Sequence, residues 1–289
     1  MTSRIHLLVI DPQNDFCDLP EAWRPADPVT GQRQAPALPV PGAHADLQRV
    51  AQLVRDGGAG LADITVTLDS HHRVDIAHPP YWQQADGSAV APFTPITAAM
   101  VRAGAFRPRD AEALPRTLAY LDALEARGRY TLMVWPVHCE IGTWGHDVHA
   151  GLHAAYADWE AATGRNVAKV TKGENTGTEH YSALLAEVPD DADPRTQLNH
   201  DLLQRLAAAD AIVVAGEAGS HCVRATVEDL AGQLGPAAAA RITLLTDAMS
   251  PVAGFEPQQQ AFLDTMRARG LRLSTTAQVL PDLQAAAAR

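Results

Sequence analysis

The chain has 289 residues, of which 46% are hydrophobic, so it can bury a sizeable core. Its formal net charge of −11 and its lack of a basic cluster exclude a protein built to hold the phosphate backbone of a nucleic acid. No apolar run in the sequence approaches the roughly 20 residues that cross a bilayer, and the run at residues 5–10 is too short for a signal peptide. We expect a cytoplasmic protein with neither a nucleic-acid nor a membrane partner.

Short apolar runs alternate with alanine-rich helical stretches along most of the chain. The runs that predict buried strands are 5–10, 64–68, 130–135, 167–171, 211–215 and 242–246. The predicted helices are 43–55, 114–127, 147–163, 196–209, 221–233 and 257–269. This alternation is typical of a parallel sheet with helices on both faces. We predict an α/β fold, a three-layer α/β/α sandwich with a central, mostly parallel, Rossmann-like sheet.

Two segments interrupt this alternation. Residues 18–41 are rich in proline, and residues 79–129 combine proline, tryptophan and glycine with one helical run. Long segments of this kind are commonly functional loops. We expect both to be insertions over the functional edge of a single domain that spans residues 1–289.

Reactive side chains follow several predicted strands, where an open parallel sheet binds its ligands. Asp11 follows the first strand, Lys172 the fourth, and Cys222 lies at the start of the helix after the fifth. A helix N-terminus favours a thiolate, its N–H groups can hold an oxyanion, and a lysine can keep both a carboxylate and a thiol ionised. Structural roles remain open, because such residues are often a turn former, a surface cation and a small buried hydrophobe.

Histidines gather at two other strand ends. The residues concerned are Asp69, His71, His72 and His78 after the second strand and His138 after the third. A mixed set of carboxylate and imidazole ligands suits Zn²⁺ or Fe²⁺. The chain holds 12 histidines, so a surface or capping role for any one of them is also open. We predict a bound metal because both groups fall at strand ends.

Five strings, taken together and in this order, resemble the nicotinamidase/isochorismatase-like superfamily of cysteine hydrolases. They are Val9-Ile-Asp-Pro-Gln-Asn-Asp-Phe-Cys17, Asp69-Ser-His71, Trp135-Pro-Val-His-Cys139, Lys172-Gly173 and Ser220-His-Cys-Val223. The chain is most similar to a longer nicotinamidase-like subgroup that shares Ile76-Ala-His-Pro79 and Glu179-His-Tyr-Ser182. The resemblance implies one isochorismatase-like hydrolase domain with the two insertions.

The resemblance implies a role for each matching residue. Cys222 is the expected nucleophile, Asp11 the base that takes its proton, and Lys172 the cation that supports both. The backbone N–H groups of Ala218 and Cys222 are the expected oxyanion hole, with a cis peptide between Glu217 and Ala218.

The same resemblance implies a metal site and an aromatic clamp. The implied metal ligands are Asp69, His71 and His138, with His78 as a further ligand for which His72 competes. The expected metal is zinc, with iron or manganese as alternatives. Phe16 and Trp135 resemble the clamp on the substrate ring, although either could equally be core packing.

The implied reaction is hydrolysis of nicotinamide to nicotinate and ammonia through a thioester on Cys222, within NAD metabolism. Another small amide or a carbamoyl compound is the main alternative, and isochorismatase-type hydrolysis is less favoured because it needs no thiol. A binding protein without turnover and a redox protein that uses Cys139 and Cys222 belong to other classes. The complete triad disfavours the first, and the lack of a Cys-x-x-Cys motif disfavours the second. We also expect a homo-oligomer and free cysteines.

Overall fold

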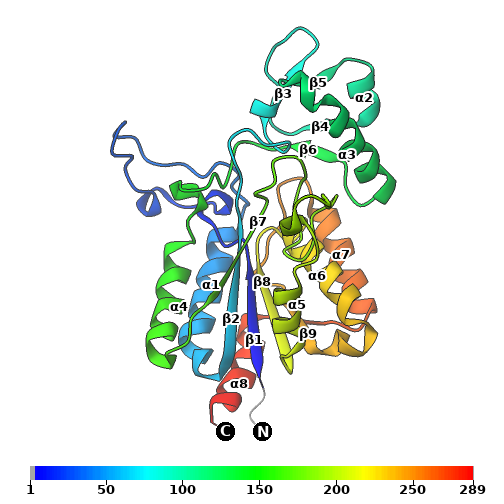
Figure 1. The fold of residues 1–289 in the computed structure, drawn as a ribbon. Helices are drawn as coiled ribbons and strands as arrows, with labels where there is room; N and C mark the ends of the chain where they lie inside the picture. The colour runs from blue at the N-terminus through cyan, green and yellow to red at the C-terminus, as the bar shows by residue number, and fades with distance from the viewer. Residues whose placement is uncertain (1–3, 289) are drawn as a thin grey trace.

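A parallel six-stranded sheet forms the centre of the molecule in the computed structural model, which describes residues 4–288 (Figure 1). From edge to edge the strands are β10 (Arg272–Ser274), β9 (Ile242–Leu245), β8 (Ala211–Gly216), β1 (Ile5–Ile10), β2 (Leu61–Asp69) and β7 (Ala168–Lys172). Every neighbouring pair runs in parallel. The predicted α/β fold with a mostly parallel sheet is therefore confirmed.

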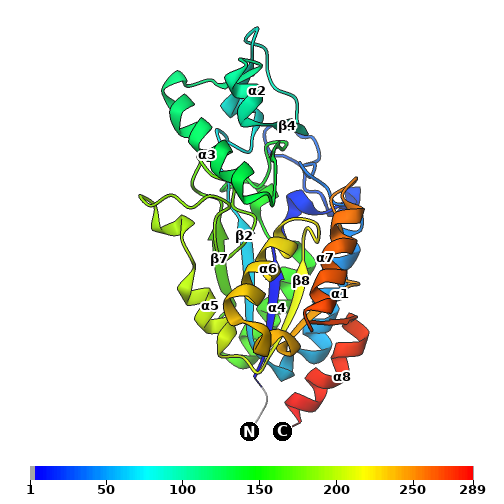
Figure 2. The same cartoon turned by 90° about the vertical axis from the view of Figure 1, so that its right-hand side faces the viewer.

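Helices cover both faces of this sheet and complete the three layers (Figures 1 and 2). On one face lie α1 (Ala43–Gly57), α4 (Ala150–Thr163) and α8 (Thr276–Ala287), and on the other α5 (His200–Ala207), α6 (Cys222–Leu234) and α7 (Glu256–Ala268). Alternate residues of β1 pack against the helices on opposite faces of the sheet. Leu8 and Ile10 join the core beneath α6, whereas Leu7 and Val9 join the core beneath α1. A strand covered on both faces is apolar over most of its length, and His6 is the one polar residue of this strand.

A smaller lobe, residues 79–134, lies above the carboxyl ends of the strands and is called the cap lobe below (Figures 1 and 2). Its elements are β3 (Trp82–Gln84), β4 (Thr94–Ile96), α2 (Ala98–Arg102), β5 (Phe106–Pro108), α3 (Leu114–Arg127) and β6 (Leu132–Val134). Trp82, Ile96 and Leu121 belong to a hydrophobic cluster separate from the two cores on the sheet. The segment expected to be an insertion thus builds a core of its own.

One predicted strand lies elsewhere. The apolar run at residues 130–135 was expected in the central sheet, but only Leu132–Val134 is extended, as β6, and it pairs antiparallel with β4 in a two-stranded sheet. An apolar run shows that a strand will be buried, and it does not show which strand will be its partner. Because the cap lobe supplies the partner here, β6 joins that lobe.

Smaller differences concern the ends of elements. Strand β10 and helix α8 complete the sheet and one helical layer, and neither was predicted as a regular element. Helix α5 begins at His200, four residues later than expected, because the side chain of Asn199 accepts the N–H of Leu202 and caps the helix. The remaining turns are the 3-10 helices Asn14–Phe16, Glu21–Trp23, Gly58–Gly60, Pro79–Tyr81, Ala111–Ala113, Trp144–His146, Pro194–Thr196 and Pro236–Arg241.

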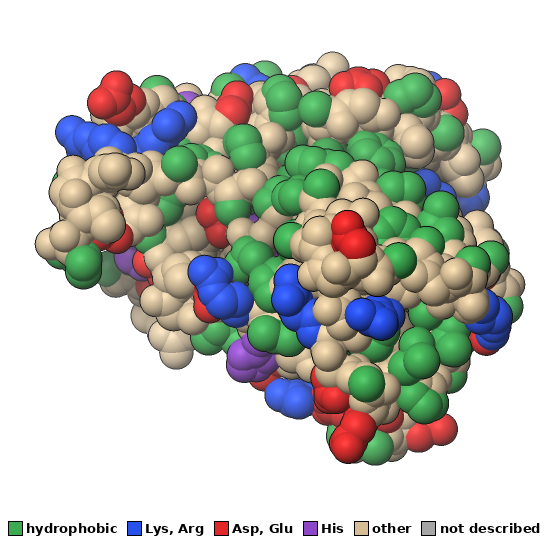
Figure 3. Space-filling model, turned by 90° about the horizontal axis from the view of Figure 1, so that it is seen from above, with side chains coloured by type: hydrophobic (Ala, Val, Ile, Leu, Met, Phe, Trp, Pro, Cys, Tyr) green, Lys and Arg blue, Asp and Glu red, His purple; other side chains and the backbone are tan. Residues whose placement is uncertain are grey.

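The face seen from above carries side chains of both charges scattered among apolar ones (Figure 3). Single large apolar side chains such as Phe93 and Ile141 are exposed, at 53% and 44%. None of the helices between residues 4 and 288 combines the length and the apolar content that a bilayer crossing requires.

Candidate active site

Asp11, Lys172 and Cys222 meet above the carboxyl ends of the strands. Asp11 directly follows β1, Lys172 is the last residue of β7, and Cys222 is the first residue of α6. The Lys172 Nζ lies 2.9 Å from Asp11 Oδ2 and 3.6 Å from Cys222 Sγ. All three residues are buried, with at most 5% of their surface exposed. The three residues proposed from the sequence as a triad are thus brought into contact.

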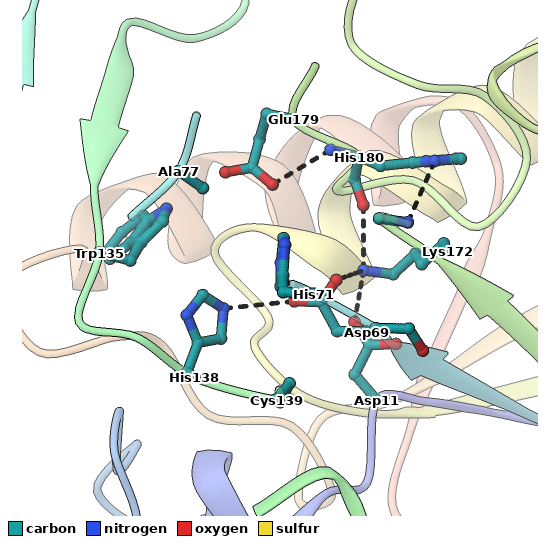
Figure 4. A network of polar contacts seen from close by, with 12 residues as sticks. Asp11, Asp69, His71, Ala77, Trp135, His138, Cys139, Lys172, Glu179 and His180 are labelled. Carbon is teal, nitrogen blue, oxygen red and sulfur yellow. Dashed lines mark hydrogen bonds and ion pairs between the residues drawn. The ribbon is translucent and has the colours of Figure 1, made fainter. Parts of the chain in front are cut away.

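The ammonium group of Lys172 is held by several acceptors at once (Figure 4). Besides Asp11 it donates to Asp69 Oδ1 at 3.0 Å and to the carbonyl of His180 at 3.0 Å. Burial lowers the pKa of Lys172, but Asp11 and Asp69 outweigh this effect and the net pKa lies well above its usual value. The group is therefore a permanent cation beside the thiol.

The carboxyl of Asp11 is oriented from the neighbouring strand. The Thr67 hydroxyl, on β2, donates to Asp11 Oδ1 at 2.6 Å and accepts the Asp11 N–H at 3.0 Å. Burial raises the pKa of Asp11, while Lys172 opposes that rise. A carboxylate whose pKa is raised is a better proton acceptor than a solvated one.

The thiol of Cys222 departs from the expectation that a helix N-terminus would favour its thiolate. Burial raises its pKa well above the usual value, and the opposing effect of Lys172 does not reverse the direction. Cys222 is therefore a thiol at neutral pH, and a base is needed to activate it. The charges of Asp11 and Asp69 both raise the pKa of this thiol further, and Asp11 has the larger effect of the two carboxylates.

Two backbone N–H groups beside the thiol remain free. The peptide between Glu217 and Ala218 is cis, as expected. Among the hydrogen bonds of residues 4–288, neither the Ala218 nor the Cys222 N–H donates to an acceptor, while the Ala218 carbonyl accepts from His221 and Val223 at 3.0 and 3.2 Å. Both donors lie in or directly after the short loop that leads into α6, and free backbone N–H groups of this kind can hold an oxyanion.

Gly216 makes the turn into this loop. It ends β8 with a φ of +116°, and a Cβ at this position would collide with the backbone oxygen of Ile10 on β1. Only glycine combines that backbone conformation with so close an approach. The chain is thereby redirected from β8 into the segment that carries Ala218 and Cys222.

Three imidazoles and one carboxylate gather next to the triad. The ring nitrogens of His71, His78 and His138 lie within 4.8 Å of one another. Asp69 Oδ2 lies 3.1 Å from His71 Nε2 and 3.3 Å from His138 Nε2. His72 is exposed and lies outside this group.

This group has the composition of a metal site. Burial and the adjacent imidazoles lower the pKa of His78 to about 2, so its ring is neutral and can act as a ligand. The second ring nitrogen of His71 lies 3.2 Å from Asp75 Oδ2, and a carboxylate behind a histidine is a common support for a metal ligand. The residues present therefore fit a divalent metal of the zinc or iron type.

Phe16 and Trp135 are buried in the same hydrophobic cluster as Cys222. The ring of Phe16 lies 5.4 Å from that of His138. Trp135 donates its Nε1–H to the Tyr181 hydroxyl at 3.0 Å. Both rings thus lie at the site, one on the histidine side and the other anchored by a tyrosine.

Several contributing residues were not identified from the sequence. Thr67 could have been suspected, because it lies two residues before Asp69 and so on the same face of β2. Asp75 follows His71 closely, but nothing in the sequence links the two side chains. His180 contributes its backbone carbonyl, for which side-chain patterns carry no signal.

Known structures share this architecture. A nicotinamidase/pyrazinamidase from Acinetobacter baumanii superposes with a TM-score of 0.60 at 19% identity, over 95% of this chain and 97% of that chain. The yeast nicotinamidase Pnc1p bound to the inhibitor nicotinaldehyde gives 0.58 at 20% identity, over 94% and 99%. The pyrazinamidase of Pyrococcus horikoshii in complex with zinc gives 0.53 at 19% identity, over 94% and 99%.

The two comparisons by sequence found no related protein. No protein-family model matches the chain, and no curated protein matches it. An isochorismatase-like hydrolase is also among the structures that superpose over nearly the whole chain. The chain therefore has the fold that nicotinamidases, pyrazinamidases and isochorismatase-like hydrolases share.

Proposed function

We propose that the chain is a cysteine hydrolase that cleaves a small-molecule amide, with nicotinamide to nicotinate and ammonia as the leading reaction. The observation that carries the proposal is the contact of Lys172 with both Asp11 and Cys222 at the head of α6, 2.9 and 3.6 Å away. A thiol, a carboxylate base and a fixed cation are the groups that amide cleavage through a thioester needs.

The proposed reaction begins with proton transfer from the Cys222 thiol to Asp11. The thiolate, beside the Lys172 ammonium, attacks the amide carbon, and the carbonyl oxygen becomes an oxyanion that accepts from the Ala218 and Cys222 N–H groups. The C–N bond breaks as Asp11 returns its proton to the nitrogen, so ammonia leaves and a thioester remains. Asp11 then takes a proton from water, the hydroxide cleaves the thioester, and the proton returns to the thiol.

The buried histidines would hold a divalent metal in this scheme, together with Asp69. Zinc is the first choice, because the donors fit it and a neighbour of the same fold is a zinc complex. Iron and manganese are the alternatives. When bound, the metal would orient a pyridine nitrogen or a water molecule. Phe16 and Trp135 would contact the substrate ring.

A larger amide or carbamoyl compound is the second candidate. A cavity of about 220 Å³ is lined in part by Tyr130, Tyr181, Phe255 and His221, the residue that precedes Cys222 in the chain. This cavity could take a substituent that nicotinamide lacks. The triad and its chemistry would be unchanged.

The setting of the protein is also part of the proposal. Cys17, Cys139 and Cys222 are all free thiols, which fits a reducing compartment such as the cytoplasm, where nicotinamide cleavage would serve NAD metabolism. The scattered exposed apolar side chains, including Phe93, are compatible with the expected homo-oligomer.

The decisive experiment measures ammonia release from nicotinamide by the parent protein, Cys222→Ala and the matched control Cys139→Ser, with metal content determined on each preparation. We expect release by the parent and Cys139→Ser and none by Cys222→Ala, because Cys222 is the proposed nucleophile and its Sγ lies 3.6 Å from Lys172 Nζ. Release by Cys222→Ala would refute the nucleophile. A parent that is inactive on nicotinamide but active on another small amide would overturn only the leading substrate.

A further inference from the structure

We propose that Glu217 is a positioning residue whose buried side chain, braced by Ser250 and Asp46, fixes the peptide that presents the Ala218 N–H to the oxyanion. The inference rests on the proposed function, because it concerns the same oxyanion hole. The donor N–H belongs to the peptide bond of Glu217 itself, so whatever holds Glu217 also aims that donor.

The first brace is the backbone of Ser250. Glu217 is fully buried, and its Oε2 accepts the Ser250 N–H at 3.1 Å. The Ser250 carbonyl accepts the N–H of Gly219 at 2.8 Å, so one residue bonds to the chain on both sides of Ala218. On the opposite side the Glu217 N–H donates to the Ile10 carbonyl at 2.8 Å. The loop is thereby held between two neighbouring segments.

The second brace is Asp46, on α1. Its Oδ2 accepts the Ser250 hydroxyl at 2.6 Å, and its Oδ1 accepts from Arg49 at 2.6 Å. Ser250 is thus in contact with both carboxyls, because its N–H donates to Glu217 Oε2 and its hydroxyl to Asp46 Oδ2, and the charge of Asp46 raises the pKa of Glu217. This contact ties the oxyanion loop to a helix that carries none of the triad.

A proton shared by the carboxyls of Glu217 and Asp46 gives Glu217 Oε1 a hydrogen-bond partner. The Oε1 of Glu217 is buried and has no partner among the described residues if the carboxyl is ionised. Burial raises the pKa of both groups, and for Glu217 the pKa is raised well above its usual value. A protonated Glu217 donates from Oε1 to Asp46 while Oε2 accepts from Ser250, which satisfies both oxygens.

The test compares Glu217→Leu with Glu217→Gln. Glutamine can donate to Asp46 and accept from Ser250, whereas leucine fills the volume without either bond. The concentration of active sites in each preparation is determined by alkylation of Cys222. We then measure kcat per active site, KM for nicotinamide and inhibition by nicotinaldehyde. Addition of the thiol to this aldehyde gives a hemithioacetal whose oxygen lies where the oxyanion would lie.

We expect Glu217→Leu to lose about 10- to 1,000-fold in kcat and a similar factor in nicotinaldehyde inhibition, with KM little changed. Glu217→Gln should keep all three within about threefold. Leu283→Ala, a buried change on α8, is the control for destabilisation alone, and it should keep kcat per titrated site. A Glu217→Leu protein with parental kcat per site and parental inhibition would overturn the inference.

A second measurement needs no substrate. Hydrogen exchange of residues 216–222, followed by mass spectrometry, should accelerate in Glu217→Leu and not in Glu217→Gln or Leu283→Ala. If Glu217→Leu does not fold, Asp46→Ala takes its place and should accelerate the same segment. Unchanged exchange overturns the inference, whereas a parent without amidase activity overturns the proposed function alone.

Discussion

The ammonium group of Lys172 is buried among two carboxylates, a carbonyl and a thiol. Burying an unpaired charge is costly, so each of these partners also stabilises the fold. The same surroundings set the protonation states. Lysine stays charged, the pKa of Asp11 rises, and the Cys222 thiol keeps its proton until a base removes it. Stability and reactivity therefore depend on the same few contacts.

Removal of the support behind His71 should weaken metal binding. In Asp75→Asn the amide group cannot accept the His71 N–H and the Ala77 N–H as the carboxylate does, at 3.2 and 2.9 Å. We expect zinc affinity, measured by competition with a chelator, to fall about 10- to 100-fold. Asp56→Asn, an exposed change on α1, should leave the affinity unchanged. Equal affinities for Asp75→Asn and the parent would contradict the role of Asp75.

At the level of helices and strands, a glycine allows two elements to approach each other closely. Helix α8 packs against the 3-10 turn before β2, and a Cβ on Gly60 would collide with the backbone oxygen of Leu283. A backbone atom cannot rotate away as the end of a side chain can. The docking of the last helix therefore depends on one residue in the turn just before β2.

We predict that Gly60→Ala lowers the free energy of unfolding by about 1–3 kcal/mol, because α8 must shift to admit the methyl group. Gly232→Ala in α6 is the matched control. Nothing lies within 4 Å of a Cβ there, so the better helix propensity of alanine should raise stability by about 0.5–1 kcal/mol. Urea denaturation measures both changes. A Gly60→Ala protein as stable as the parent would show that α8 docks loosely.

Across the whole molecule, three separate hydrophobic clusters stabilise the fold. Two lie on opposite faces of the sheet, and the third belongs to the cap lobe. Figure 2 shows this lobe above the carboxyl ends of the strands. Some titratable side chains, such as His6, are buried in the folded protein, and burial favours their neutral form. The global stability of the protein therefore depends on pH.

His6 provides a test of this dependence. Burial lowers its pKa to about 4, and its Nε2 lies 2.8 Å from the Thr65 hydroxyl. The folded protein favours the neutral ring, so the unfolded chain takes up more protons as the pH falls below 6.5, and the unfolding free energy declines until about pH 4. By linkage the loss amounts to about 3 kcal/mol at most.

In urea denaturation at pH 7 and pH 5, His6→Gln should lose less stability between the two pH values than the parent, because glutamine does not titrate. His153→Gln, an exposed change on α4, should lose as much as the parent. If His6→Gln and the parent decline equally, His6 is not among the groups that set this dependence.

Local patterns in the chain were enough to predict which strands end near reactive residues. Asp11, Asp69 and Lys172 each stand next to an apolar run, and Cys222 begins the helix that follows another such run after a short loop. These are local features of the chain. The parallel sheet followed from the alternation of such runs with helices. One placement failed, that of residues 130–135, because an apolar run does not name its partner strand.

The strand order, and the contacts that depend on it, could not be predicted from local patterns. The order places β2 between β1 and β7, and so places Asp69 where Lys172 can reach across it to Asp11. The hydrogen bonds of Ser250 to Glu217 and to Asp46 join three residues that are far apart in the sequence. The pKa of Cys222 rose where its helix position alone predicted a fall. Hydrophobic periodicity is local, whereas strand pairing and burial depend on residues far away in the chain.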